Sequence, residues 1–265
     1  MNEVDFSKVL IVVATQRSGT NLLRSLLADS KQFVDYKEVF GQRIVDLPNS
    51  YFNFRKKIYQ ENLDYSLPTV ENVEIIFKRY LEYLQNKSKN NGLILDIKYN
   101  SFCHFTPFWH SPSEPPMLVK LIKKYQIPVI HLIRDNVLET ECSTQLYRKN
   151  WVATLREGEK LKHTTVSIDT NTIIKRLNQR NKEIKLFKDY FKDYQYVCTI
   201  NYAEISKGSL TTQTRNKINE KLNIDIKEDV TSPLKKMGRS LSETIENYGE
   251  VSKLLYNYGF EYLLS

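Results

Sequence analysis

The stretch Val9–Leu27 constrains the fold more than any other part of the chain, because a strand, a turn and a helix follow one another there without a gap. The apolar run Val9–Val13 is rich in β-branched residues, which is typical of a strand buried on both faces of a parallel sheet. A polar turn, Thr15–Thr20, separates it from leucines that recur at helical spacing. The pattern predicts the first βα unit of a doubly wound α/β fold.

The turn itself carries residues suited to an anion. A glycine turn that opens a helix directs backbone N–H groups and the positive helix end at a ligand. Arg17 adds a planar donor fork that matches phosphate or sulfate oxygens, and Ser18, Thr20 and Asn21 add short polar side chains. An ordinary surface turn explains these residues equally well. The segment is not a Walker A motif, because no lysine follows Gly19, so a γ-phosphate is not the reactive group that it favours.

Length and composition bound the class of protein. The chain has 265 residues, of which 41% are hydrophobic and 26% charged, as expected of a globular protein with one large domain over residues 1–265. The net charge of +8 indicates either a lysine-rich surface or attraction for polyanions. No block of like charge is long enough for a nucleic-acid-binding tail, so we expect no nucleic-acid partner.

The cysteines and the N-terminus indicate a compartment. Cys103, Cys142 and Cys198 are widely spaced and form neither a metal-ligand pattern nor a disulfide framework. A reducing cytoplasm is therefore expected, with no bound metal. The acidic start, Met1–Asp5, and the short apolar run behind it predict neither a signal peptide nor a membrane span.

A carboxylate follows the first helix. The stretch Phe33–Gly41 is predicted to be irregular and to emerge at the same end of the sheet as the turn, because the chain must return there after the helix. Glu38 stands in it among aromatic and aliphatic residues. It is a candidate general base in a partly desolvated cleft, and the alternative is a solvated loop carboxylate.

Lys98 ends the next predicted strand, Leu93–Tyr99. The carboxyl end of a strand in a doubly wound sheet faces the ligand crevice, so Lys98 could contact a ligand bound there. A lysine that faces solvent at a strand end is the interpretation favoured by the residues alone. The aromatic, proline-rich loop 101–116 contains His104 and His110, which are the alternative candidate bases. A structural or solvent-exposed role is the more common one for a histidine in such a loop.

A second strand–arginine unit repeats the first. The apolar run Ile127–Ile133 is followed by Arg134 and by a helix that begins near Val137. Two such units side by side can bind two separated phosphates of one ligand. The alternative for Arg134 is a salt bridge to its neighbour Asp135.

Further elements follow from hydrophobic periodicity and from residues that start or end helices. Residues 51–67 are expected to be partly helical and to form walls of the ligand crevice. Residues 151–166 are expected to form a lid. The remaining predicted elements are a helix capped by Thr69, a short helix Met117–Tyr125, a helix from about Thr170, a strand Tyr196–Ile200 and a final helix Val251–Tyr258.

The turn sequence T-x-R-S-G-T-N-L-L-x-x-L-L resembles the 5′-phosphosulfate loop of sulfotransferases that use 3′-phosphoadenosine-5′-phosphosulfate (PAPS). The similarity is strongest to the bacterial carbohydrate type, which includes nodulation-factor and trehalose sulfotransferases. The resemblance implies a P-loop-like α/β sulfotransferase fold. It also implies that the 5′-phosphosulfate is held by Arg17, Ser18, Gly19, Thr20 and Asn21. Asn21 stands where a second hydroxyl residue is common in the family.

Four further segments resemble the same family in order along the chain. Glu38-Val39-Phe40 matches the loop of the proposed base. Ile133–Asn136 with Ser143 matches the 3′-phosphate site, although Cys142 occupies the shorter spacing of the animal enzymes. Tyr202 matches a tyrosine that packs on the adenine, or is a core tyrosine. The cations Lys235, Lys236 and Arg239 match a loop that closes over the 3′-phosphate side.

The resemblance implies sulfuryl transfer from PAPS to a hydroxyl of a carbohydrate or a small polar natural product, leaving 3′-phosphoadenosine-5′-phosphate (PAP). Glu38 would accept the proton, and Arg17 and Lys98 would stabilise the transferred charge. No metal is demanded. Sulfation at nitrogen, self-association, a nucleotide-dependent small-molecule kinase and a non-catalytic polyanion-binding protein remain open at this point.

Overall fold

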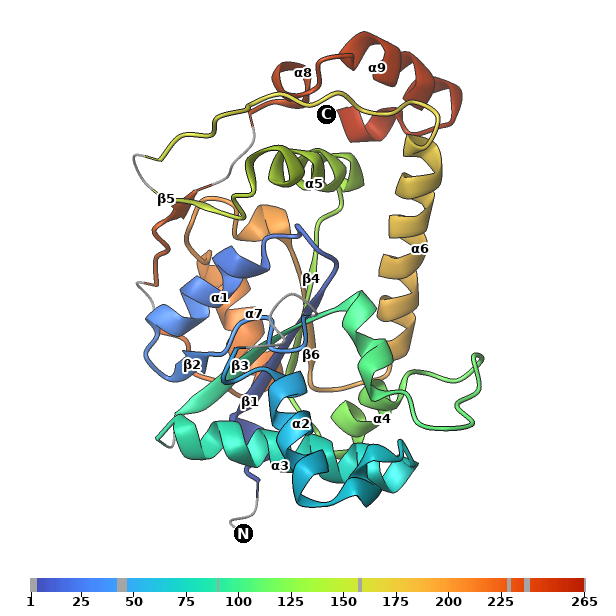
Figure 1. Ribbon diagram of the computed structural model, residues 1–265. Helices are drawn as coiled ribbons and strands as arrows, with labels where there is room; N and C mark the ends of the chain where they lie inside the picture. The colour runs from blue at the N-terminus through green and yellow to red at the C-terminus, as the bar shows by residue number, and fades with distance from the viewer. Residues whose placement is uncertain are drawn as a thin grey trace.

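A central parallel sheet organises the protein. The computed structural model describes residues 4–41, 47–89, 91–156, 159–227, 230–235 and 239–264. Within these ranges the main sheet has the strand order β2-β3-β1-β4-β6, and every pairing in it is parallel. Its strands are β1 (Val9–Ala14), β2 (Phe33–Asp35), β3 (Gly92–Lys98), β4 (Val129–Ile133) and β6 (Val197–Asn201). The expected α/β class with a central parallel sheet flanked by helices is confirmed (Figure 1).

The strand order creates a crevice at one place. β1 lies between β3 and β4, with Val12 opposite Asp96 and Ile11 opposite Val129. The chain leaves β1 toward the edge strand β2 and leaves β4 toward the opposite edge strand β6. Neighbouring strands whose connections depart in opposite directions define the ligand-binding crevice of a doubly wound sheet. Arg17 and Arg134 follow these two strands.

Helices cover both faces of the sheet and bury it completely on β1, β3 and β4. α1 (Thr20–Asp29) and α7 (Thr212–Leu222) pack with Leu10 and Val12 of β1 on one face. α3 (Val70–Lys87) and α6 (Ile173–Phe191) belong to the cluster of Val9 and Ile11 on the other face. Each fully buried aliphatic side chain stabilises the fold by ~1.5–3 kcal/mol.

Side-chain caps set the starts of several helices. Thr69 Oγ1 accepts a hydrogen bond from the N–H of Asn72 at the start of α3, as predicted. Ser50 caps α2 (Tyr51–Glu61) through the N–H of Asn53. Asn136 caps α5 (Val137–Asn150) through the N–H of Glu139. The α5 cap matters for the site, because it fixes the helix that follows Arg134.

The C-terminal part of the chain returns to the carboxyl edge of the sheet. β5 (Leu155–Arg156) and β7 (Leu234–Lys235) form a small antiparallel pair. α8 (Leu241–Thr244) and α9 (Tyr248–Asn257) lie beyond α5, at the end of the molecule opposite to α2 and α3 (Figure 1). The shorter elements are α4 (Met117–Lys124) and the 3-10 turns Phe6–Lys8, Leu63–Ser66, Tyr99–Phe105, Tyr202–Glu204 and Glu261–Leu264.

The structure differs from the sequence-based expectations in a few places. The stretch Phe33–Gly41 is not wholly irregular, because it contains β2, whose three residues are too few to show a periodicity. β4 begins two residues later than predicted, and the 101–116 loop begins within a 3-10 turn.

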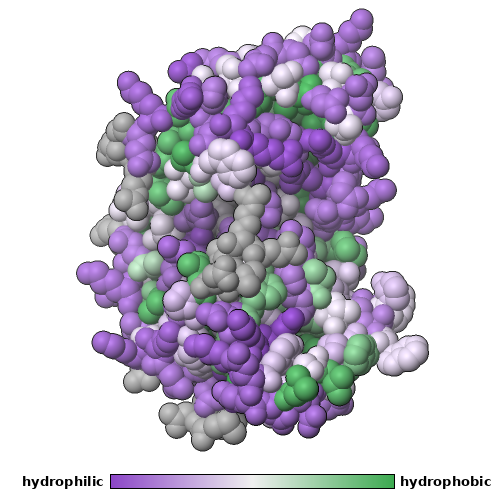
Figure 2. All heavy atoms as spheres, viewed as in Figure 1, coloured by the Kyte–Doolittle hydropathy of each residue, from purple (hydrophilic) through white to green (hydrophobic). Residues whose placement is uncertain are grey.

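Hydrophilic side chains dominate the face seen in Figure 2. Across the described ranges, no helix combines the length and apolar character that a membrane crossing needs.

Candidate functional site

A cavity of about 420 Å³ lies at the carboxyl ends of β1, β3 and β4. This is within the range of small-molecule sites. It gathers residues that are far apart in the sequence and that the sequence analysis singled out. Its lining includes Arg17, Gly19, Thr20, Asn21, Glu38, Lys98, Arg134, Ser143, Tyr202 and Arg239.

The turn after β1 has a backbone that few residue types can adopt. Arg17 has a φ of 68° and Gly19 a φ of 93°, both in the left-handed region. A Cβ placed on Gly19 would overlap the ring of Tyr202, so only glycine fits there without movement. Gly19 is also the N-cap of α1 and provides no side-chain cap, which leaves the first N–H groups of the helix for another acceptor. Ser18 is fully buried, and its hydroxyl has no hydrogen-bond partner within the described residues.

The two strand-end arginines lie in direct contact. Nη1 of Arg134 donates to the backbone carbonyl of Arg17 at 3.2 Å. Nε of Arg17 donates to Oγ of Ser143 at 3.1 Å, and its Nη2 donates to the carbonyl of Ala153 at 3.0 Å. Arg134 pairs with Glu139 of α5, with 2.6 Å between Nη2 and Oε2. The alternative of a salt bridge between Arg134 and Asp135 is therefore wrong, because Asp135 instead accepts a hydrogen bond from Asn201.

The positive charges at this end of the sheet repel each other. Burial and the nearby charge of Arg134 lower the pKa of Arg17. A guanidinium nevertheless stays protonated at neutral pH. The buried Arg134 and the partly buried Arg17 together raise the local potential, and an anion bound between them would relieve it.

Tyr202 is the first residue after β6 and sits between the two units. The guanidinium carbon of Arg134 lies over its ring, 4.5 Å from the centroid, and the ring packs against the Gly19 position. Burial raises the pKa of the Tyr202 hydroxyl. Tyr202 is therefore packed like a core residue and also lines the cavity.

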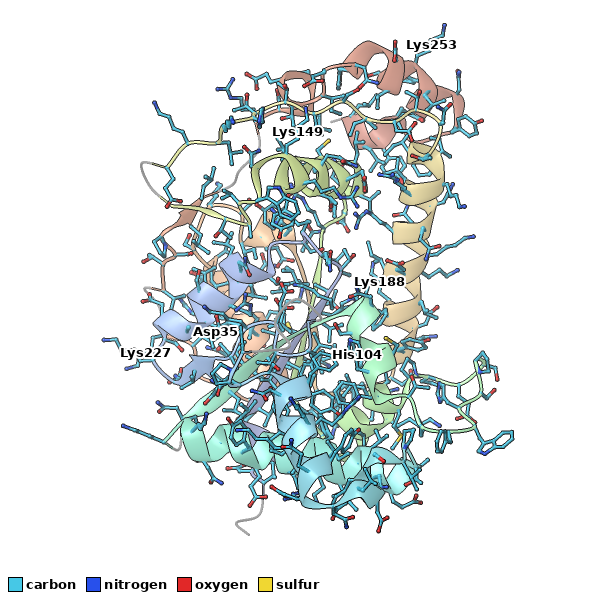
Figure 3. The ribbon with its side chains drawn as sticks, viewed as in Figure 1. Asp35, His104, Lys149, Lys188, Lys227 and Lys253 are labelled. Carbon is cyan, nitrogen blue, oxygen red and sulfur yellow. The ribbon has the colours of Figure 1, made fainter. Side chains whose placement is uncertain are left out.

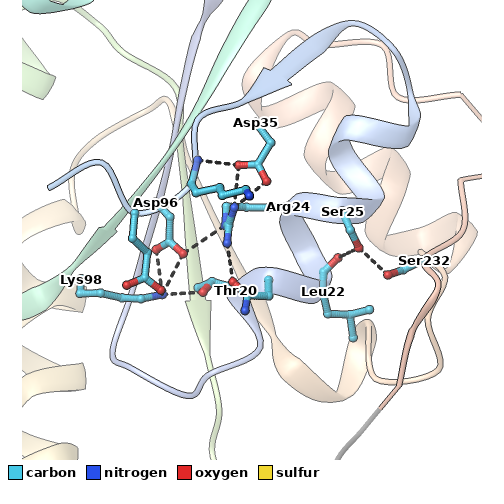
Figure 4. Close-up of polar contacts among 11 residues, drawn as sticks. Thr20, Leu22, Arg24, Ser25, Asp35, Asp96, Lys98 and Ser232 are labelled. Carbon is cyan, nitrogen blue, oxygen red and sulfur yellow. Dashed lines mark hydrogen bonds and ion pairs between the residues drawn. The ribbon is translucent and has the colours of Figure 1, made fainter. Parts of the chain in front are cut away.

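Lys98 is buried rather than exposed to solvent, so the interpretation favoured by the residues alone is wrong. Its residue is 4% exposed. Nζ lies 2.8 Å from Oδ1 of Asp96 and donates to Oγ1 of Thr20 (Figure 4). It also lies 3.5 Å from Oε1 of Glu38. These partners offset the cost of burying the ammonium group.

Of the three candidate bases, Glu38 is the one on the cavity. Its side chain is 41% exposed and lines the cavity beside Lys98. Among the described residues, neither His104 (labelled in Figure 3) nor His110 lines it. The ring of His104 packs edge-on against Phe52 with 4.8 Å between centroids, and burial lowers its pKa. His110 belongs to a separate pocket beside Trp109.

Other predicted ligand residues are placed differently. The amide oxygen of Asn21 accepts a hydrogen bond from Arg24, so this part of the side chain is committed within α1. Arg239 lines the cavity. Lys235 ends β7, where its backbone pairs with Leu155, and Lys236 lies outside the described residues.

Several groups on the cavity or in contact with its flanking elements were not predicted from the sequence. Tyr147 and Arg148 of α5 line it, and the guanidinium of Arg17 lies over the Tyr147 ring, 5.2 Å from the centroid. Tyr147 stands one helical turn after Ser143, a spacing that could have identified it. Arg180 of α6 contacts Glu141 of α5 and Thr15, the residue that follows β1. No local pattern signals that contact, because α6 is distant in the sequence.

Comparisons with known proteins give only remote similarity. No family model matches the chain, and no curated protein matches it. The solved structures that match include a mouse sulfotransferase, SULT7A1, complexed with PAP, at 15% identity and a TM-score of 0.43, over 84% of this chain and 61% of the mouse chain. They also include the sulfotransferase domain of an olefin synthase from Synechococcus PCC 7002, at 13% identity and a TM-score of 0.42, over 91% of this chain and 82% of that one. Similarity at this level assigns neither a family nor an activity to the chain.

Proposed function

We propose that this protein is a PAPS-dependent sulfotransferase, with one domain over residues 1–265. The observation that carries the proposal is the contact between two strand–arginine units on one cavity. Arg17 and Arg134 follow neighbouring strands, and 3.2 Å separates Nη1 of Arg134 from the carbonyl of Arg17. The motif resemblance had assigned these same two residues to the 5′ and 3′ groups of PAPS.

The residues of the cavity fit such a ligand. The turn would hold the 5′-phosphosulfate through Arg17, the first N–H groups of α1 and the buried hydroxyl of Ser18, which has no partner in the described part of the chain. Arg134 and Ser143 would bind the 3′-phosphate, and Tyr202 would pack on the adenine. Cations of the tail would close over the 3′-phosphate side: Lys235, Lys236 and Arg239.

The chemistry divides between the cofactor and the chain. Bound PAPS supplies an activated sulfuryl group whose leaving group is PAP. Glu38 accepts the proton of the acceptor hydroxyl, since it is the candidate base that lines the cavity. Arg17 and Lys98 provide fixed positive charge where negative charge develops. Lys98 is held in place by Asp96 and Thr20.

The acceptor belongs to the proposal as well. Polar side chains line the part of the cavity near Arg17, among them Gln16, Thr144 and Thr154, and they suit a hydroxyl-bearing ligand. We therefore propose a carbohydrate or a small polar natural product, by analogy with the bacterial carbohydrate type. The three cysteines are free thiols, in keeping with the cytoplasmic location that we propose.

Two measurements on the wild-type protein test the proposal. Isothermal titration calorimetry should detect binding of PAP, and incubation with labelled PAPS and an acceptor panel should yield a sulfated product identified by mass spectrometry. A thermal shift with ATP and magnesium but not with PAP would instead support a kinase. Salt-dependent association with polyanions, without a PAP-specific shift, would support a non-catalytic binding protein.

A further inference from the structure

Arg24 of α1 joins two carboxylates that come from different strands, the buried Asp96 and the partly buried Asp35. Its residue is 5% exposed. Nη1 lies 2.6 Å from both carboxylate oxygens of Asp35, and Nε lies 3.2 Å from Oδ2 of Asp96 (Figure 4). Burial acts to lower the pKa of Arg24, but the charges of Asp96 and Asp35 outweigh it and raise the pKa. The guanidinium therefore bridges β2 and β3 from the helix that begins at the phosphosulfate turn.

Each of these carboxylates stands just before a residue of the proposed reaction. Asp35 precedes Glu38 by three positions, and Asp96 precedes Lys98 by two. The backbone ties the two segments together, because the N–H of Asp96 donates to the carbonyl of Lys37 at 3.0 Å. The N–H of Lys37 in turn donates to Oδ1 of Asp35 at 2.8 Å. Lys37 has a φ of 64°, a conformation that depends on such local contacts.

The charges around Lys98 balance without Glu38. Arg24 and Lys98 contribute two positive charges, and Asp35 and Asp96 contribute two negative ones. Nζ of Lys98 lies nearer to Asp96, at 2.8 Å, than to Glu38, at 3.5 Å. The ammonium group of Lys98 therefore has its closest carboxylate contact with Asp96 rather than with Glu38.

We propose that Arg24 is a positioning residue that sets the separation of the Glu38 carboxylate and the Lys98 ammonium. The inference rests on the proposed function, since it concerns the same reaction. Arg24 holds the segment of Glu38 through Asp35 and the strand of Lys98 through Asp96, so it controls both partners at once. Lysine cannot replace it, because a single ammonium group lacks the planar fork that reaches two carboxylates.

The test compares Arg24→Lys with Arg79→Lys. Arg79 of α3 also pairs with a carboxylate, because its Nη2 lies 2.8 Å from Oε2 of Glu61. Neither Arg79 nor Glu61 lines the cavity. The measurements are kcat with labelled PAPS, the Kd of PAP and hydrogen exchange of the segment 35–41. A second variant, Asp35→Asn, removes only the charge of the more exposed partner, whose side chain is 22% exposed, and it retains an oxygen for the N–H of Lys37.

We expect Arg24→Lys and Asp35→Asn to lower kcat roughly ten- to a hundred-fold, as a small misplacement of reacting groups does. The Kd of PAP should stay near the wild-type value, and exchange at residues 35–41 should become faster. Arg79→Lys should change none of these quantities. If Arg24→Lys does not fold, Asp35→Asn carries the test.

Two results would overturn the inference. One is a wild-type kcat in folded Arg24→Lys or Asp35→Asn protein. The other is unchanged exchange at residues 35–41 in both variants. Failure of the proposed function looks different, because the wild-type protein itself would then neither bind PAP nor consume PAPS, while the exchange comparison would still report on the bridge.

Discussion

Nη1 of Arg134 donates a hydrogen bond to the backbone carbonyl of Arg17 over 3.2 Å. This bond links the end of β4 to the turn after β1, at a residue whose φ is 68°. Because non-glycine residues rarely adopt that conformation, Arg134 supports the turn as well as carrying charge. A direct hydrogen bond therefore connects the two halves of the proposed cofactor site.

Removing either arginine should weaken cofactor binding. We expect Arg17→Ala and Arg134→Ala each to reduce PAP affinity by ~1.5–3 kcal/mol, the typical value of a charge-assisted hydrogen bond. The double variant should deviate from additivity by ~0.5–3 kcal/mol, because the residues are in contact. Calorimetry measures all three, with Lys185→Ala on the exposed side of α6 as the control. Unchanged affinity in both single variants would contradict the proposed site.

Replacing the proposed base should separate turnover from binding. Glu38→Gln keeps the shape of the side chain but cannot accept the acceptor's proton. We expect kcat to fall by ~10²–10⁴, with the Kd of PAP retained. His104→Asn serves as the comparison, because His104 does not line the cavity and its replacement should leave turnover intact. If the loss appeared in the His104 variant instead, the base would be reassigned.

The glycine of the turn offers a conformational test. Gly19→Ala combines a left-handed φ of 93° with a Cβ that overlaps the Tyr202 ring, so the turn must shift. We expect loss of PAP binding and a lower free energy of unfolding, by ~1–2 kcal/mol for the backbone conformation alone. Gly249→Ala in α9 is the matched control. Apart from its chain neighbours and the backbone of its own helix, no described atom lies within 4 Å of its new Cβ, and alanine favours a helix. Equal behaviour of the two variants in urea unfolding and PAP titration would be inconsistent with this account.

A buried histidine should make stability depend on pH. Burial, aided by the charge of Lys188, lowers the pKa of His131 from 6.5 to about 4, and His131 hydrogen-bonds the hydroxyl of Tyr99 at 2.7 Å. The unfolded chain binds this proton more readily than the folded chain. The contribution of neutral His131 to stability is therefore fully present above pH 6.5 and is lost as the pH falls toward 4. Between pH 7.5 and 5 the loss is about 2 kcal/mol.

Urea unfolding of the wild type and His131→Gln at pH 7.5 and 5 measures this contribution. The variant has an altered core at both pH values, so the difference between its two unfolding free energies is the quantity to compare. That difference should be about 2 kcal/mol smaller in the variant than in the wild type. The same pH dependence in both proteins would mean that the pKa of His131 does not differ between the folded and unfolded states.

The elements that carry the arginines could be read from the sequence. β1 and β4 are continuous apolar runs, so their burial and their parallel pairing followed from residue types alone. Arg17 and Arg134 then had to lie at one edge of the sheet, and they do. By contrast, β2 was missed, because three partly buried residues carry too little pattern, and the solvent-facing interpretation of Lys98 failed.

Local sequence determined the longer strands β1, β3, β4 and β6, the turn after β1, the Thr69 cap and the positive groups that reach the carboxyl edge of the sheet. These outcomes depend on periodicity and backbone preference, which act over a few residues. Only the tertiary structure decided that Lys98 is buried with Asp96, that Glu139 rather than Asp135 pairs with Arg134, and that Arg24 bridges two strands. Such pairings depend on the burial of groups that are distant in the chain and on the distances between them. Residue spacing in the sequence predicts neither quantity.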